Sequence, residues 1–250
     1  MKWRTTIGIP AILLISSMAR ADVVLFDNLG AAYTQNYTGE FVTQGPTGSS
    51  PITTRLFMTK ITFINGSSGQ DITGITFSVY NNNSASVRAR SRLRFWNADG
   101  ASGAPGSYYT PGGLGAIGYT LNPIEFEPGL NIVETGVSPG FIVPQNGSAI
   151  WAGLTFDNSG TPTTGAQMAN LGQGLFYSPA LVGTVGNEVF ETTNAGSFFG
   201  TNNPAGAFAD RNVNNQDAAY GWKFTAVPEP SGFAAMLLGG LVIFRRRTRK

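Results

Sequence analysis

The sequence predicts an all-β protein, an antiparallel β-sandwich or jelly roll, with an N-terminal signal segment and a short C-terminal hydrophobic helix. Within residues 22–226, apolar residues recur with a period of two in short runs, which is typical of half-buried strands. Clusters rich in Gly, Asn, Ser and Pro separate these runs, and such clusters form turns. No window of this body has the apolar spacing of a long helix, so a parallel α/β fold lacks its crossover helices.

The periodic runs give ten expected strands in one domain. In chain order they cover residues 23–26, 39–43, 56–64, 72–80, 87–96, 117–121, 131–134, 149–156, 188–192 and 219–225. Two aromatic but irregular segments, 175–177 and 197–208, are expected to be loops that cover the core.

Residues 1–21 have the pattern of a signal peptide. Lys2 and Arg4 precede an apolar stretch at 7–15, and Ala19-Arg20-Ala21 fits a small-x-small cleavage site. An uncleaved anchor is the alternative, but the apolar stretch is shorter than the roughly 20 residues that span a bilayer. We therefore expect the mature chain to begin at Asp22.

Composition excludes several functional classes. The chain has no histidine and no cysteine, which removes Ser-His-Asp and Cys-His nucleophile systems and the usual zinc sites. Half of the sixteen Lys and Arg residues lie in the two end segments, so residues 22–226 keep eight against thirteen Asp and Glu, a net charge of −5. The basic character of the chain comes from its ends, and nucleic-acid binding is not expected.

The sequence VRARSRLRFW at 87–96 is the most regular candidate site. Alternate side chains of a strand face opposite sides, so one face is predicted to carry a row of basic residues that ends in an indole: Arg88, Arg90, Arg92, Arg94 and Trp96. Such a face could bind acidic polysaccharide through guanidinium-carboxylate pairs and stacking on Trp96. The alternative is a solvated outer face, or an edge strand whose charges discourage pairing with another chain.

Paired carboxylates raise the possibility of a glycoside hydrolase, which needs two Asp or Glu residues and no histidine. Glu125 and Glu127 flank Phe126 on what could be one strand face. Two such acids are also common on a solvated face, so no catalytic residue is assigned and a non-enzymatic protein is expected.

A calcium loop is a second possibility, because DRNVNNQD places oxygen donors at Asp210, Asn212, Asn214 and Asp217. The turn glycine of such loops is replaced by Asn215, and the closing acid position falls on Gly221. An Asn-rich loop without an ion is the alternative, and no metal is assigned.

The loop at 100–115 carries Tyr108 and Tyr109 on a glycine-rich backbone. Exposed aromatic residues on loops can stack on sugars. The alternative is that one of the two tyrosines packs on the sandwich.

The segment 227–250 has three parts: Pro228-Glu229-Pro230, an apolar stretch at 231–244, and the basic residues Arg245, Arg246, Arg247, Arg249 and Lys250. As a helix the apolar stretch covers roughly 21 Å, less than the ~30 Å hydrocarbon core. The basic end is expected to stay cytoplasmic and to stop transfer. An ordinary single-span membrane protein is the alternative.

These three parts in this order, together with an N-terminal signal, resemble the PEP-CTERM sorting signal of Gram-negative bacteria that make extracellular polysaccharide. The resemblance implies that an exosortase, a membrane cysteine transpeptidase, recognises the Pro-Glu-Pro element and removes the hydrophobic and basic tail. It also implies a transient stage in the inner membrane and delivery to the cell surface or matrix. The resemblance is confined to 227–250.

The sequence therefore favours an exported, non-enzymatic surface or matrix protein without a cofactor, and the hypothesis adds binding of extracellular polysaccharide by the body. Two alternatives stay open: a carboxylate-dependent carbohydrate-active enzyme and a calcium-stabilised adhesion module.

Overall fold

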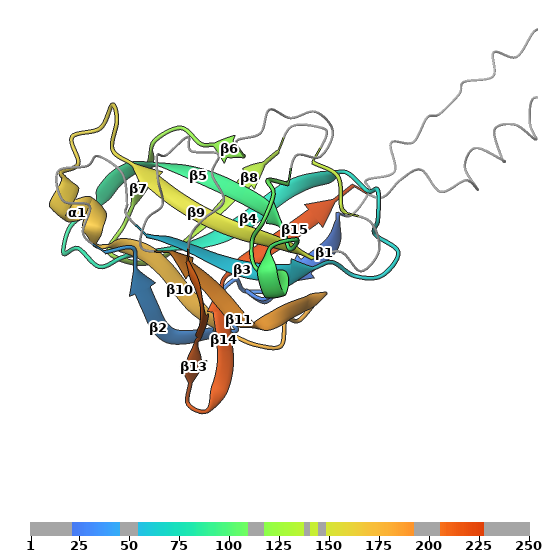
Figure 1. The fold of residues 1–250 in the computed structure, drawn as a ribbon. Coiled ribbons are helices and arrows are strands. Elements are labelled where there is room, and N and C mark those ends of the chain that lie inside the picture. Colours follow the sequence, from blue (N-terminus) through green and yellow to red (C-terminus); the bar gives the residue numbers. More distant parts are fainter. Residues whose placement is uncertain are drawn as a thin grey trace, which may run out of the picture.

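The computed structural model describes residues 22–45, 55–109, 118–137, 141–144, 149–192 and 206–227, without the side chain of Asn187. These residues form two antiparallel sheets that pack face to face (Figure 1). The all-β prediction is confirmed. The described helical segments are short: α1 (Gly165–Ala169) and a 3₁₀ turn at Ala101–Gly103.

Sheet A contains the first and last described strands. Its order is β1 (Val23–Asp27), β15 (Trp222–Ala226), β4 (Ile72–Asn81), β10 (Leu171–Tyr177), β14 (Gln216–Tyr220) and β13 (Asn212–Val213), with β2 (Tyr37–Thr43) paired to β10 and β8 (Gly129–Gly136) paired to β4. β14 and β15 form one line of chain broken at Gly221, and they pair with β10 and β4 respectively.

Sheet B carries the candidate sites. Its order is β12 (Ala207–Asp210), β11 (Thr184–Thr192), β3 (Leu56–Thr62), β9 (Ile150–Asp157), β5 (Val87–Asn97) and β6 (Tyr119–Thr120), with β7 (Ile124–Phe126) also paired to β5. β9 is buried along its whole length, as expected for a central strand with both faces covered.

The main core lies between the two sheets and is rich in aromatic rings. Phe57 of sheet B stacks on Tyr220 of sheet A with ring centroids 5.1 Å apart, and Phe95 contacts Trp222 at 6.3 Å. Each buried side chain of this size contributes about 1.5–3 kcal/mol relative to exposure. The absence of disulfides is therefore offset by burial.

A second, smaller apolar cluster lies on the other face of sheet B. Its members occupy the positions that alternate with the main core along β3, β5, β9 and β11, so they point away from sheet A. The buried members are Leu56, Met58, Trp96, Trp151 and Phe190. Sheet B consequently has apolar residues on both faces, and its outer face needs a cover.

A polar contact joins the two sheets near β12. Tyr220 on β14 donates its hydroxyl hydrogen to Glu191 on β11 at 2.5 Å, and Arg211 donates to the same carboxylate oxygen through Nε at 2.7 Å and Nη2 at 2.5 Å. Burial raises the pKa of Tyr220 well above its usual range, and the Glu191 carboxylate adds to this effect. The contact fixes the chain between β12 and β13 against the sandwich.

Most expected strands are present, and the main error concerns β10. Residues 175–177 and part of 197–208, predicted as loops, belong to β10 and β12. β10 has the sequence LGQGLFY, whose glycines obscure a period of two. Gly172 is needed there because a Cβ atom would lie 2.0 Å from the carbonyl oxygen of Val42 on β2.

The body begins and ends at one place in the fold. The first and last described strands, β1 and β15, lie side by side (Figure 1), and Val23 at the start of β1 pairs with Ala226 at the end of β15. Within the described ranges, no helix has the length and apolar character that crossing a membrane requires. The stretches at 7–15 and 231–244 lie outside those ranges.

Candidate functional site

The basic row on β5 is not an open surface. Its side chains alternate with the core positions as predicted, but only Arg88 is exposed and Arg90 is half-buried. Arg92, Arg94 and Trp96 are 3%, 2% and 0% exposed. The expectation of an exposed ligand face is therefore wrong for these three residues.

Neighbouring chain segments explain this burial. Arg90 forms an ion pair with Asp157 on β9, and Arg92 donates from Nη1 to the hydroxyl of Thr120 on β6 at 2.5 Å. Burial lowers the pKa of Arg92 to about 10, and the nearby Arg94 guanidinium adds to the effect. The guanidinium groups of Arg90 and Arg92 therefore have partners within the fold.

A segment after β5 covers the row, and residues 98–109 are called the cover loop here. Tyr108 pairs with Trp96, their ring centroids are 5.2 Å apart, and the Tyr108 hydroxyl accepts from Arg94 Nη2 at 2.6 Å. The indole N–H of Trp151 donates to the carbonyl of Gly103 at 3.0 Å. The loop thus closes over the middle of the outer face of sheet B.

Both predicted sugar-stacking tyrosines are packed. Tyr108 lies on the outer cluster, while Tyr109 turns to the main core, where its ring is 5.9 Å from Phe141 and its hydroxyl donates to the carbonyl of Ile142. Burial raises the pKa of Tyr109 to about 12. The expectation of two exposed rings is therefore corrected: each is half-buried on a different side of β5.

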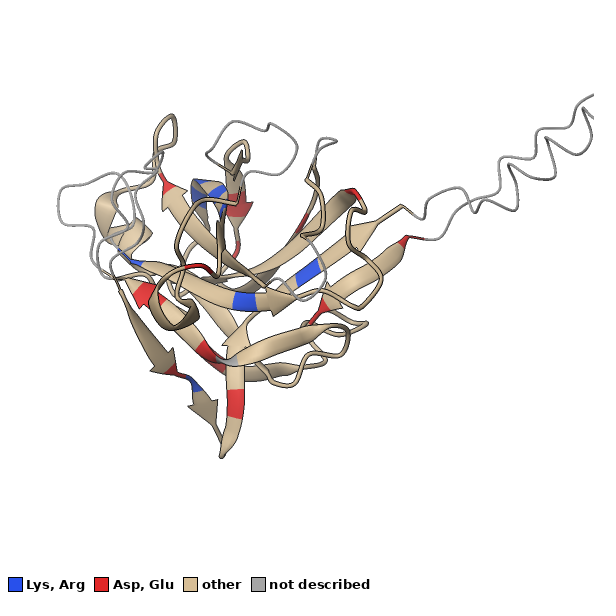
Figure 2. Cartoon of the chain, turned by 45° about the vertical axis from the view of Figure 1, so that its right-hand side comes forward, with Lys and Arg blue, Asp and Glu red and all other residues tan. Residues whose placement is uncertain are grey.

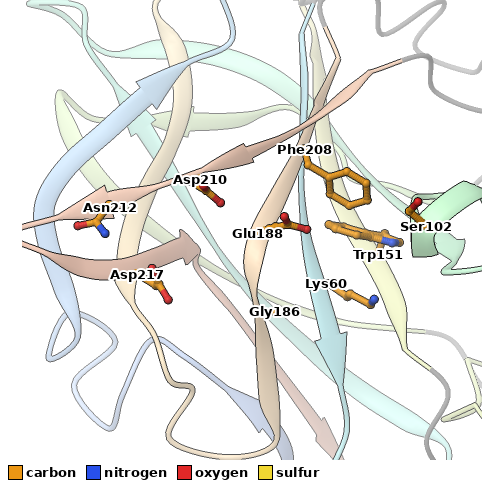
Figure 3. Close-up of a pocket in the computed structure, with 9 residues that line it drawn as sticks. All are labelled: Lys60, Ser102, Trp151, Gly186, Glu188, Phe208, Asp210, Asn212 and Asp217. Carbon is orange, nitrogen blue, oxygen red and sulfur yellow. The ribbon is translucent and has the colours of Figure 1, made fainter.

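Beyond the cover loop, the outer face of sheet B is open and forms a hollow of about 610 Å³ (Figure 3). It lies between the 3₁₀ turn on one side and the β12 to β14 segment on the other. Its lining consists of Lys60, Ser102, Trp151, Gly186, Glu188, Phe208, Asp210, Asn212 and Asp217. We call this space the hollow.

Strand register places the lining groups. Glu188 on β11 is directly opposite Asp210 on β12, so their side chains lie side by side on the outer face. Phe208 stands two residues before Asp210 and therefore shares this face, as Figure 3 shows. Its ring centroid is 6.1 Å from that of Trp151, whose side chain is 0% exposed and forms the floor.

Electrostatically, the hollow is acidic. Three carboxylates line it against one amine, that of Lys60, whose Nζ is 5.9 Å from the centroid of the Trp151 ring. Figure 2 shows that acidic positions also outnumber basic ones over the described body, in line with thirteen acids against eight bases in 22–226. The charge of the hollow is opposite to that of the row predicted as a ligand face.

The predicted calcium loop is a β-hairpin. Asn212 pairs with Asp217, and Asn214 and Asn215 form its turn with φ values of 53° and 62°. The oxygen donors are two residues apart, as in a calcium loop, because alternate side chains of a strand lie on the same face. Among the described residues, no three acidic, histidine or cysteine side chains are grouped to hold a metal ion.

The remaining sequence candidates lie elsewhere. Glu125 on β7 is exposed and accepts from the hydroxyl of Ser86 at 2.6 Å, and Glu127 is exposed beyond the same strand. Neither lines the hollow. Pro228-Glu229-Pro230 and the basic residues at 245–250 lie outside the described residues.

Several lining residues were not predicted as a site. Lys60, Glu188 and Phe208 come from three strands, and Phe208 fell in a segment expected to be a loop. The sequence does contain a signal for this strand face, because Phe208, Asp210 and Asn212 are spaced two residues apart. Their convergence with β3 and β9 depends on sheet order, which local patterns do not give.

Comparison of the chain with models of protein families, with curated proteins and with solved structures found no match.

Proposed function

We propose that this is an exported, non-enzymatic protein of the bacterial surface or extracellular matrix, sorted through its C-terminal Pro-Glu-Pro element. The observation that carries the proposal is the order of three elements after the body: Pro228-Glu229-Pro230, an apolar stretch and a basic end. An exosortase-type enzyme would remove the tail after a transient stage in the inner membrane. The proposal includes two structural expectations: the strands are connected as in a jelly roll, and residues 231–244 form a helix.

The position of the tail in the fold supports removal without damage to the body. β15 pairs with β1 on one side and with β4 on the other, and one residue, Val227, separates its last residue, Ala226, from the sorting element. A cut beyond Ala226 therefore breaks none of these strand pairings.

A carbohydrate-active enzyme is the second candidate, because the hollow brings Glu188, Asp210 and Asp217 together. Glycosidases usually keep one carboxyl protonated through burial. Glu188 and Asp210 are both exposed, and they stand side by side on neighbouring strands. This arrangement favours binding over hydrolysis.

The sorting proposal is tested by expressing the full chain in a Gram-negative host that has an exosortase and in the same host without it. The mass of the purified protein is then measured. We expect loss of the segment 231–250 only in the host with the enzyme, and retention of the tail in a Glu229→Gln, Pro230→Ala variant.

The chain offers a matched control, because Glu127-Pro128 is a second Glu-Pro dipeptide in the exposed part of the body. A Glu127→Gln, Pro128→Ala variant should be processed like the unchanged protein. An intact tail on the unchanged protein in the host with the enzyme would refute the proposal.

A further inference from the structure

The hollow has the dimensions and composition of a ligand site that the sorting proposal does not use. Its volume of about 610 Å³ lies within the roughly 300–1,000 Å³ of typical small-molecule sites. It combines one aromatic ring at its side with carboxylate, amide, hydroxyl and amine groups around it. Such a combination suits a ligand with an apolar face and a polar rim.

Phe208 supplies the apolar contact. It is half-buried, and its inner side is held by the rings of Trp151 and Phe190 with centroids 6.1 Å and 5.5 Å away. A ring fixed in this way offers its remaining surface at low entropic cost. The C–H face of a pyranose ring is a suitable counterpart.

The acids of the hollow are available for a ligand. Some acids elsewhere are engaged internally: Glu191 binds Arg211, and Asp157 binds Arg90. Within the described part of the chain, by contrast, Glu188, Asp210 and Asp217 have neither an ion pair nor a side-chain hydrogen bond. Carboxylates accept hydrogen bonds from hydroxyl groups and bind ammonium groups most strongly.

The charge of the lining indicates which class of polysaccharide the hollow would bind. With three carboxylates and one lysine, the lining has a local charge of −2, and it repels uronate or sulfate groups. An amine on a sugar ring would be attracted. Gly186 lies beside Lys60 in this lining, since a Cβ atom there would be in ordinary van der Waals contact with Cβ of Lys60 at 3.4 Å.

A basic peptide is a weaker fit to the same charge. An extended peptide needs backbone partners for its own N–H and C=O groups, usually at a sheet edge. The hollow lies over the face of sheet B, and residues of six strands line it: β3, β9, β11 and β12 of sheet B, and β13 and β14. Hydroxyl and amine groups of a glycan match such a lining better.

We infer that the hollow binds an amine-bearing glycan, with Phe208 against a sugar ring and the neighbouring carboxylates of Glu188 and Asp210 toward the amine. The inference rests on the proposed exported function for its setting, since glycans of this kind would be met outside the cell. It corrects the sequence-based hypothesis, which placed an acidic polysaccharide on the row of arginines.

The test is calorimetric titration of the full chain in detergent with a glucosamine oligomer, its fully N-acetylated counterpart of equal length, an oligouronate and an oligolysine. We expect binding of the glucosamine oligomer and weakening as ionic strength rises. Glu188→Gln and Asp210→Asn should each lower the affinity about tenfold, as expected for a lost charged hydrogen bond. Glu127→Gln, a matched exposed acid outside the hollow, should bind like the unchanged protein.

A Gly186→Phe variant tests the location, because its side chain would fill the hollow and should abolish binding while the far-ultraviolet circular dichroism stays the same. Equal affinity for the N-acetylated oligomer would overturn the role of the amine. Equal affinity for oligolysine would overturn the glycan assignment, and no binding of the glucosamine oligomer would overturn the site. Because the titration uses the full chain with its tail, a failure here is separate from a failure of tail processing.

Discussion

The outer face of sheet B has two halves that differ in cover. Over β5 and β9 the cover loop buries Arg94, Trp96 and Trp151, so that these large side chains act as a second core. Over β11 and β12 the same face is open, and Phe208 and Glu188 border the hollow. One apolar cluster extends across both halves: Trp96 and Trp151 are paired positions of β5 and β9, and Trp151 contacts Phe208.

The difference shows that a row of charged and aromatic residues does not by itself indicate a binding surface. Arg94 lies with its guanidinium carbon 5.0 Å from the centroid of the Trp96 ring, and the Tyr108 hydroxyl of the cover loop accepts a hydrogen bond from it. In the open half, the carboxylates of Glu188 and Asp210 have neither an ion pair nor a side-chain hydrogen bond within the described chain. Cover by neighbouring segments, more than residue type, separates a structural face from a candidate site.

The largest expected effect is a difference in stability between the two halves. Trp96→Ala should lower the free energy of unfolding by about 3–5 kcal/mol, because it leaves a cavity under the cover loop. Phe208→Ala, in the open half, should cost about 1–2 kcal/mol, because this ring is only partly buried. Chemical denaturation of the two variants measures the difference, and equal losses would mean that the two halves are equally covered.

The cover itself is the target of the second prediction. Gly106 has no space for a side chain, since a Cβ atom would lie 2.0 Å from Oδ1 of Asp99 and 2.6 Å from the backbone nitrogen of Gly100. Gly106→Ala should therefore displace the loop, lower the free energy of unfolding by about 1–3 kcal/mol and shift tryptophan fluorescence to the red. Gly136→Ala on β8, where the nearest atom would lie 3.8 Å from the added Cβ and φ is not positive, is a control for changing a glycine. An unchanged emission maximum in Gly106→Ala would show that the loop does not shield Trp96 and Trp151.

Much of the fold was accessible to local sequence patterns. Period-two alternation located β4, β5 and β9 and correctly divided the side chains of β5 between two faces. It failed at β10, where glycines at two positions permit close approach of β2 but supply no side chain to the pattern. Local periodicity thus predicts where a strand lies in the sequence, but it does not predict which other strand it pairs with.

The site was less accessible, because burial on an outer face depends on segments far away along the chain. The alternation in β5 could not indicate that Thr120 and Tyr108 would pack on its arginines. Likewise, Glu188 and Asp210 become neighbours only through the pairing of β11 with β12. The donor spacing at 210–217 was real, but it came from strand geometry.

The smallest expected effect concerns the closure of the cover loop by Asp99. Its carboxylate accepts from the backbone nitrogen of Ser107 at 2.7 Å and from the Ser107 hydroxyl, and that hydroxyl lowers the pKa of Asp99 below its usual value. A lowered carboxyl pKa contributes stability above the unfolded value near pH 4, and this contribution is lost as the pH falls through the folded value. Asp99 is exposed, so Asp99→Asn should change the free energy of unfolding by less than about 0.5 kcal/mol. Denaturation at neutral pH and at pH values below the Asp99 pKa measures this contribution. The difference in the free energy of unfolding between Asp99→Asn and the unchanged protein should become smaller in acid. Glu127→Gln is the control for changing an exposed acid. A difference that grows in acid would show that the Asp99 carboxylate does not hold the loop.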